Sequence, residues 1–292
     1  MSYAPMVKPG KNVKLSDYAT EETAGLNKDA ARELLKPLKE QIRELQALLY
    51  AASQNSVLIV LQGMDTSGKD GTVSSVLESV NPLGCRVWPF KTPTPLELSH
   101  DFLWRIHQKV PERGMMTVFN RSHYEDVLIA RVKELVPKAT WAKRYDQINE
   151  FEELLTESGT IILKFFLHIS KSEQEERLMK REEDPEKAWK LAASDWVERQ
   201  YWRQYQTAYE VALSKCSTKA APWIIVPADQ KWYRDLAVAQ RLIDAMEPYQ
   251  ESWRSSLEAL GKTQLAEIKL LRDREQSAER TGTSPKKVKS AT

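Results

Sequence analysis

A loop of glycine, hydroxyl and charged residues, Gly63-Met64-Asp65-Thr66-Ser67-Gly68-Lys69, carries the clearest chemical signal in the sequence. It follows the apolar run Val57–Leu61 and precedes a helix-compatible segment over 69–80. Glycines let backbone N–H groups turn inward, a helix N-terminus adds partial positive charge, and a lysine adds a full charge. The pattern predicts a phosphate-binding loop in which Lys69 stabilises a transferring phosphoryl group. Further substrate contacts are expected from Gly63, Thr66, Ser67, Gly68 and Gly71.

Two carboxylates distinguish this loop from an ordinary nucleotide-binding loop. Asp70 stands where a Ser or Thr hydroxyl usually follows the lysine and binds magnesium. Asp65 lies within the loop, where it repels phosphate, so it is predicted to bind Mg²⁺ (or Mn²⁺) or to orient an acceptor phosphate. Asp70 has two open readings, a metal contact or a residue that favours the start of a helix, and Thr72 is a third candidate for the metal contact.

A second polar motif, Asn120-Arg121-Ser122-His123-Tyr124-Glu125-Asp126, directly follows the predicted strand over 115–119. Parallel strands end at one edge of a sheet, so Arg121 is expected beside the loop, where its guanidinium suits phosphate oxygens. Asn120 replaces the aspartate that often ends this strand. Glu125 and Asp126 are candidates to reach a metal or nucleotide. The alternative is that Ser122 and Glu125 cap the following helix, which would leave Arg121 and Asp126 free.

A charged segment over 171–217 follows the predicted strand 160–169. Arg177 and Arg181 are four residues apart, so they share one helix face with Lys180 beside them. Such a run is either a solvated surface or a lid that supplies positive charge to the transferring group. A lid over 171–195 is predicted, with Arg181 as its main contributor.

An acceptor site is predicted at the proline-rich turn Pro89–Pro95, close to where nucleoside monophosphate kinases bind their acceptor. Phe90 either stacks on a base or packs in the core, and Thr94 is a second candidate contact. The aromatic residues between Trp189 and Tyr209 recur at helical spacing, which favours a packing or oligomer-forming stripe. Further basic residues proposed for a substrate channel are Arg131, Lys133 and Arg144.

Alternation of apolar strands and amphipathic helices predicts an α/β fold with a five-stranded parallel sheet covered by helices on both faces. The predicted divisions are an extended N-terminal arm over 1–25, a kinase domain over 26–250, a C-terminal helix over 251–272 and a disordered tail over 273–292. The phosphate-binding loop would then lie at the carboxyl ends of the strands.

Composition narrows the function classes. The chain has 292 residues, a net charge of +2 and two distant cysteines without metal-ligand spacing. The near-neutral charge disfavours nucleic-acid and membrane binding, so any basic site must be local. No apolar run reaches the ~20 residues that a membrane span needs. A cytoplasmic location and unpaired cysteines are expected.

The motifs together resemble polyphosphate kinase family 2. The resemblance is carried by Leu61–Gly71, Phe119–Leu128 and Leu163–Lys171, and it extends from about Leu26 to Glu247. The Asn-Arg-Ser-His-Tyr-Glu-Asp version is similar to the subgroup, often called class III, that phosphorylates both AMP and ADP. Other subgroups carry Asp at the position of Asn120. Because Asn120 is neutral, the resemblance implies that metal binding falls to Asp65 in this sequence.

The resemblance implies a P-loop kinase fold related to thymidylate kinase and reversible, magnesium-dependent transfer of the terminal phosphoryl group of polyphosphate to an adenine nucleotide. It implies a homodimer or homotetramer. The implied catalytic residues are Asp65, Lys69, Asn120, Arg121 and Arg181. Two rival readings remain open, an ATP-dependent nucleoside monophosphate kinase and a non-catalytic nucleotide or polyphosphate sensor.

Overall fold

The core of the protein is a five-stranded parallel sheet with strand order β2-β3-β1-β4-β5. The structure, a computed structural model, describes residues 3–190 and 192–281. The strands are β1 (Ser56–Gln62), β2 (Cys85–Pro89), β3 (Met116–Asn120), β4 (Thr160–His168) and β5 (Trp223–Pro227). Every residue of β1 is buried, as expected for a central strand covered on both faces. The predicted fold class is therefore confirmed.

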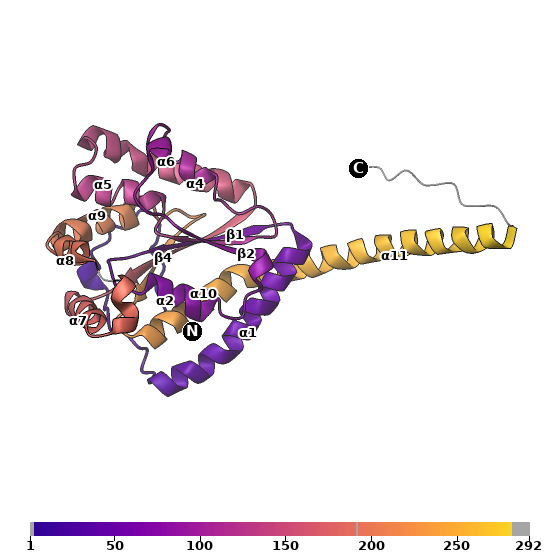
Figure 1. Cartoon of the computed structure of the whole chain (residues 1–292), viewed down its shortest axis with the longest axis horizontal. Helices are drawn as coiled ribbons and strands as arrows, with labels where there is room; N and C mark the ends of the chain where they lie inside the picture. The colour runs from indigo at the N-terminus through magenta and orange to yellow at the C-terminus, as the bar shows by residue number, and fades with distance from the viewer. Residues whose placement is uncertain (1–2, 191, 282–292) are drawn as a thin grey trace. The chain divides into compact units, whose positions relative to one another are not determined.

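Helices cover both faces of this sheet (Figure 1). One face carries α1 (Lys28–Ala52), α2 (Lys69–Val76) and α10 (Lys231–Met246). The other carries α4 (Trp104–His107), α5 (Ile129–Val132), α6 (Lys138–Glu157) and α9 (Trp202–Lys215). Helix α1 begins at the N-cap Asn27, whose side chain accepts a hydrogen bond from the Ala30 N–H, and it runs through Pro37.

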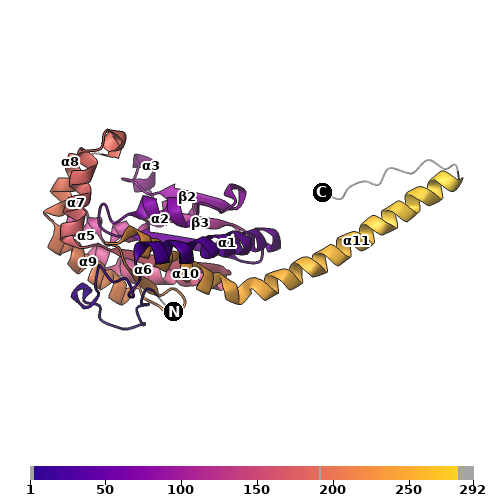
Figure 2. The same ribbon diagram turned by 90° about the horizontal axis from the view of Figure 1, so that it is seen from below.

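The segment after β4 forms a separate group of helices beyond one end of the sheet, α7 (Lys171–Glu182), η4 (Pro185–Lys190) and α8 (Ala193–Arg199) (Figures 1 and 2). Ser170 caps α7 by accepting a hydrogen bond from the Glu173 N–H. This group extends a few residues beyond the predicted lid segment, to Arg199. Because it follows the carboxyl end of β4, it stands on the side where the phosphate-binding loop lies.

Short elements connect the larger ones. They are η1 (Leu15–Asp17), η2 (Pro82–Gly84), α3 (Pro95–Leu98), η3 (His123–Asp126) and η5 (Glu247–Tyr249). The segments 95–109 and 122–158 are thus each divided into separate helical pieces. In the second stretch, α6 begins directly after Pro137, which adopts an extended conformation as its N-cap.

The N-terminal arm packs along the edge of the sheet beside β5. Met6 forms an antiparallel bridge with Ile224, and the Val7 N–H donates to the Trp223 carbonyl oxygen at 2.8 Å. Val13 and Leu15 are buried. The arm therefore belongs to the same compact unit as the sheet, which extends to Pro248.

The C-terminal helix α11 (Gln250–Thr281) falls in a second unit and is longer than predicted. Its sequence loses apolar residues after Leu271, which suggested a disordered tail from residue 273. The structure instead continues the helix to Thr281, because alternating acidic and basic residues there are good helix formers. The remainder of the predicted tail, 282–292, lies outside the described residues.

Cys85 and Cys216 are both unpaired, as predicted. Among the described residues no helix combines the length and apolarity needed to cross a membrane.

Candidate active site

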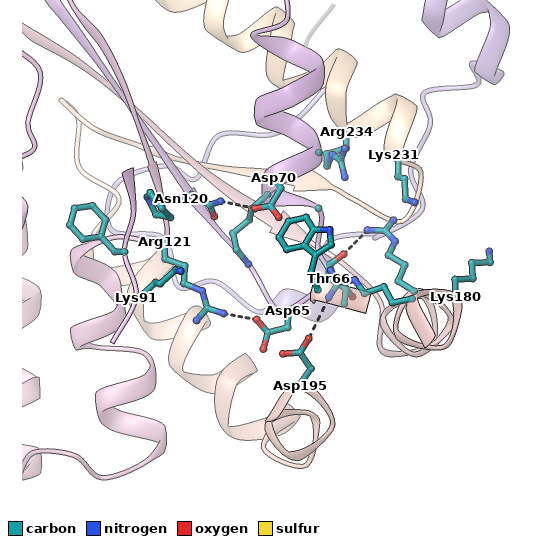
Figure 3. Close-up of a pocket in the computed structure, with 18 residues that line it drawn as sticks. Asp65, Thr66, Asp70, Lys91, Asn120, Arg121, Lys180, Asp195, Lys231 and Arg234 are labelled. Atoms are coloured by element: carbon teal, nitrogen blue, oxygen red, sulfur yellow. Dashed lines mark hydrogen bonds and ion pairs between the residues drawn. The ribbon is translucent and has the colours of Figure 1, made fainter. Parts of the chain in front are cut away.

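A cavity of about 710 Å³ lies where the strands end (Figure 3). The loops after β1, β2 and β3, the lid helices and the first turns of α2 and α10 all contribute to its walls. Eight basic residues line it against three acidic ones. The basic residues are Lys69, Lys91, Arg121, Arg177, Lys180, Arg181, Lys231 and Arg234, and the acidic residues are Asp65, Asp70 and Asp195. This surplus suits a ligand that carries several negative charges.

Glycines shape the loop between β1 and α2 because neighbouring groups leave no room for a Cβ atom. A Cβ on Gly63 would lie 2.7 Å from the Leu167 carbonyl oxygen. Gly68 has φ +101°, and a Cβ there would lie 1.8 Å from a terminal nitrogen of Arg234. Thr66 also has a positive φ, +63°. Close neighbours and left-handed backbone angles therefore restrict the conformation of this loop.

Lys69 is buried at the base of the cavity, in the first turn of α2. Its Nζ donates hydrogen bonds to the carbonyl oxygens of Gly63, at 2.9 Å, and Met64, at 3.2 Å. Burial, reinforced by the positive charge of Arg121, lowers the pKa of Lys69 to about 8. The carboxylates of Asp65, Glu125 and Asp70 oppose this shift in part, and a bound phosphate would favour the charged form further.

Arg121 stands on the other side of the loop, directly after β3. Its backbone is left-handed, with φ +62°, and its N–H donates to the Leu61 carbonyl oxygen at 3.1 Å. Its guanidinium donates to Asp65 at 2.6 Å (Figure 3). It also donates to Glu125 at 3.4 Å. Glu125, and then Asp65, raise the pKa of Arg121 against the opposing effect of burial. Arg121 and Lys69 therefore present two fixed positive charges to one cavity.

Asn120 replaces the aspartate that often ends this strand, Asp70 replaces the usual hydroxyl residue, and the two side chains are joined to each other. The Asn120 side-chain amide donates to the Asp70 carboxylate at 2.7 Å (Figure 3). The end of β3 is thus tied to the start of α2, and both side chains line the cavity.

The lid helix α7 contributes three basic residues, which differ in their contacts. Arg177 is buried and donates to the carbonyl oxygens of Thr66, at 2.9 Å, and Ala228, at 2.7 Å. Lys180 and Arg181 pair with carboxylates of the lid itself, Lys180 with Glu176 and Arg181 with Asp195, the latter at 3.3 Å. Arg177 therefore clamps the phosphate-binding loop, whereas Lys180 and Arg181 face the cavity from helices of the lid.

Several predicted site residues do not line the cavity. Asp126 turns toward α6, where it accepts from Arg144 at 2.9 Å. Thr94 caps α3 through a reciprocal pair of hydrogen bonds with Glu97. Thr72 donates to the Gly68 carbonyl oxygen at 3.2 Å. The other predicted residues away from the cavity wall are Gly63, Ser67 and Glu125. Ser67 is buried, and its hydroxyl has no hydrogen-bond partner in the described part of the chain.

The three additional basic residues proposed for a channel are also engaged elsewhere. Arg131 donates to Tyr145, and Lys133 pairs with Glu198 at 3.0 Å. Arg144 holds Asp126. None of the three lines this cavity, and their assignment to a substrate channel stays a prediction.

Phe90 packs in the core, since it is 8% exposed and lies edge-on against Phe119. It also lines the cavity, so its stacking on a base stays a prediction. Within the predicted aromatic stripe, Trp202 and Tyr209 pack in the core. Trp189 does not, because it is 79% exposed and lines the cavity.

Sequence reasoning missed Lys91, Trp189, Asp195, Lys231 and Arg234. For Lys231 and Arg234 a signal existed, because they follow β5 and the carboxyl ends of parallel strands meet at one edge. Arg234 is buried, pairs with Asp235 and lies against the loop glycines. For Asp195 the sequence offers no comparable signal, since one carboxylate in a charged helix is usually solvated.

The residues present fit a magnesium ion shared with substrate. No group of three or more His, Cys, Asp or Glu side chains suited to a metal occurs in residues 3–190 and 192–281. Magnesium usually binds through one or two carboxylates, several waters and substrate phosphates rather than in a cage of protein ligands. Asp65, whose side chain is 20% exposed at the cavity, meets that requirement.

A parallel sheet with a glycine-rich loop before a helix, a buried loop lysine and an arginine-bearing lid defines the class of P-loop phosphotransferases. The sequence profile described as "Polyphosphate kinase 2 (PPK2)" matches residues 25–254. The chain belongs to this family of kinases.

Individual relatives agree with that assignment. The chain is 49% identical over 243 residues to an AMP/ADP-polyphosphate phosphotransferase of Meiothermus ruber, covering 82% of this chain and 91% of the relative. It is 45% identical over 260 residues to an ADP-polyphosphate phosphotransferase of Rhodopseudomonas palustris, covering 85% and 90%. The crystal structure of polyphosphate kinase 2 from Arthrobacter aurescens TC1 matches with a TM-score of 0.80 at 43% identity, covering 86% of this chain and 93% of that one.

Proposed function

We propose that this protein transfers the terminal phosphoryl group of inorganic polyphosphate to AMP and to ADP, forming ADP and ATP in a reversible, magnesium-dependent reaction. The observation that carries the proposal is the excess of eight basic over three acidic residues around one cavity beside a phosphate-binding loop. A polyphosphate donor needs a basic surface rather than a base-binding pocket. The names of the relatives from Meiothermus ruber and Rhodopseudomonas palustris support the same reaction.

Each named residue has a role that its position allows. Lys69 and Arg121 neutralise charge on the transferring group, and Arg181 adds charge from the lid. Asn120 holds Asp70 at the start of α2. Asp65 would hold the magnesium ion, which when bound offsets charge on the donor and acceptor phosphates. The transfer is in line between two bound anions, so alignment and charge neutralisation are sufficient.

The test uses purified protein with AMP, Mg²⁺ and a single donor. With polyphosphate and no ATP, we expect ADP and then ATP. An ATP-dependent nucleoside monophosphate kinase would form ADP only when ATP is supplied, and a sensor would bind without turnover. Either result would contradict the proposal.

Asp65→Asn tests the metal role, because it removes the ligand charge at nearly constant shape. We expect kcat to fall by about 100-fold or more and the Mg²⁺ concentration for half-maximal rate to rise. Asp29→Asn is the matched control, since Asp29 is 93% exposed on α1. Unchanged magnesium dependence in Asp65→Asn would exclude this role.

We further propose a homodimer or homotetramer as the working form. Light scattering on the full chain tests this, and a monomer at assay concentration with full activity would contradict it.

A further inference from the structure

A cluster of buried polar side chains lies behind Arg121, outside the cavity. We call Glu152, Lys164, His123 and Tyr124 the Glu152 cluster, and each is at most 1% exposed. Glu152 accepts hydrogen bonds from the Tyr124 hydroxyl, at 2.8 Å, and from His123 Nε2, at 3.1 Å. Its second oxygen accepts from Lys164 Nζ, which also donates to the Tyr124 hydroxyl at 2.9 Å. The cluster therefore forms a closed network around one ion pair.

The Glu152 cluster joins elements that are distant in sequence. Glu152 lies on α6, Lys164 on β4, and His123 and Tyr124 on η3. Lys164 also donates to the carbonyl oxygen of Cys216, after the end of α9. All three donors on Lys164 are thus used, and η3 is fixed to the sheet and to the helices of one face.

Stability alone is a weak reason for such a cluster. Removing two charges from water costs free energy that their attraction repays only with good geometry, and apolar side chains of similar volume often serve as well. Buried networks do, however, fix a unique arrangement of the groups they hold. The groups held here are His123 and Tyr124, which follow Arg121 by two and three residues.

The turn at Arg121 needs such support. A left-handed backbone is strained for a residue other than glycine and persists only where the surroundings enforce it. On one side, Arg121 donates to Leu61, and the Ser122 hydroxyl accepts from Gln62 at 3.1 Å, so the turn is tied to β1. On the other side, Ser122 is the one residue between Arg121 and His123 of the cluster, and it is buried.

We propose that Glu152 and Lys164 are positioning residues for phosphoryl transfer, which hold the strained turn so that the Arg121 guanidinium reaches the cavity. They touch no substrate and act through Arg121. The inference rests on the proposed function, because it takes Arg121 as a group that stabilises the transferring phosphoryl.

A double-mutant cycle on the full chain tests the proposal. We expect Glu152→Gln to lower kcat with polyphosphate and AMP by about 10- to 100-fold, since small misplacements of an aligned group have effects of that size. In the Arg121→Ala background the same substitution should change kcat by less than about twofold, because the group it positions is gone. A merely structural role would lower kcat by the same factor in both backgrounds, which would overturn the proposal.

Two further variants keep the test decisive. If Glu152→Gln does not fold, Tyr124→Phe replaces it, because it removes one hydroxyl and leaves the ion pair intact; about a tenfold loss with the same non-additivity is expected. Ser56→Ala is the matched control. Ser56 is buried and bonded to Thr160 at 3.0 Å, but it lies at the opposite end of β1 from the site, so kcat should not change.

The outcomes separate this inference from the proposed function. If Arg121→Ala itself leaves kcat unchanged, the role of Arg121 in the proposed function fails. If Arg121→Ala lowers kcat strongly while Glu152→Gln and Tyr124→Phe do not, only the positioning role fails.

Discussion

The two walls of the cavity hold their positive charges in different ways. We call the phosphate-binding loop and the basic residues that contact it the loop wall, and the remaining lid residues the lid wall. The basic residues of the loop wall, Lys69, Arg177 and Arg234, are at most 9% exposed. Lys69 and Arg177 donate to backbone carbonyl oxygens, which cannot move without deforming the loop. On the lid wall, Lys180 pairs with Glu176 on the same helix, and Arg181 pairs with Asp195 on α8. The positive groups of the loop wall are held in place, whereas those of the lid wall have carboxylate partners that a substrate phosphate can replace.

This difference indicates how the two walls divide the work. Ion pairs near the surface contribute only about 0–1 kcal/mol each, so a phosphate can replace a lid carboxylate at little cost. Lys69 instead donates to backbone carbonyl oxygens, so its ammonium group is already in position before substrate binds. We infer that the loop wall sets the geometry of transfer and that the lid wall adds charge when substrate is bound.

Removing the fixed charge should have the largest effect. Lys69→Ala should lower kcat by about 1,000-fold or more, as expected for a group that stabilises the transferring phosphoryl. Steady-state assays with polyphosphate and AMP measure it. Lys36→Ala is the control, because Lys36 is exposed on α1 and does not line the cavity. A loss below tenfold would contradict a central role for Lys69.

Removing the exchangeable charge should have a smaller effect. Arg181→Ala should lower kcat by about 100-fold, because the fixed charges of the loop wall remain. Arg203→Ala, an exposed residue on α9, is the control. If Arg181→Ala cost as much as Lys69→Ala, the two walls would not differ as we infer.

The fixed wall also depends on a glycine. Gly68→Ala would strain the backbone by about 1–2 kcal/mol and would also force Arg234 to move, which costs a further ~1–3 kcal/mol. Gly10→Ala is the matched control, because Gly10 has φ +74° but open space around its Cα. Denaturant unfolding of both variants measures the difference. Equal losses would mean that contact with Arg234 does not matter.

The smallest predicted effect concerns pH. With a pKa of about 8, Lys69 loses its proton in the free protein above that pH. We expect kcat/KM for polyphosphate to fall about tenfold per pH unit above pH 8. Bound phosphate favours the charged form, so kcat should persist to higher pH. A kcat/KM profile that stays flat to pH 10 would contradict the claim that the charged form of buried Lys69 is needed for reaction with polyphosphate.

The same burial affects stability with the opposite trend. Because the folded pKa of Lys69 lies below its ordinary value of 10.5, the unfolded chain binds more protons between pH 8 and 10.5. The contribution of Lys69 to the free energy of unfolding therefore rises with pH across that window.

Local patterns were enough to predict the sheet, the phosphate-binding loop and the placement of Asp65, Lys69 and Arg121 around one cavity. Each of these follows directly from a strand end, and parallel strands bring their ends together. Contacts between distant segments were not predictable. The choice of Asp126 between the cavity and Arg144 depends on where α6 packs, and the contact of Arg234 with Gly68 depends on α10. Arg177 was predicted as a lid contact, but tertiary packing makes it a clamp on the loop.

The central claim is direct transfer from polyphosphate to a nucleotide. Phosphorus NMR of one reaction, with polyphosphate, AMP, Mg²⁺ and no ATP at the start, follows it most directly. We predict that the signal of internal polyphosphate groups falls one for one with the phosphoryl groups gained by the nucleotide, first as the β-phosphate of ADP, while the chain-end signal stays constant and inorganic phosphate does not accumulate. Release of inorganic phosphate in place of ADP, or unchanged polyphosphate, would contradict the account.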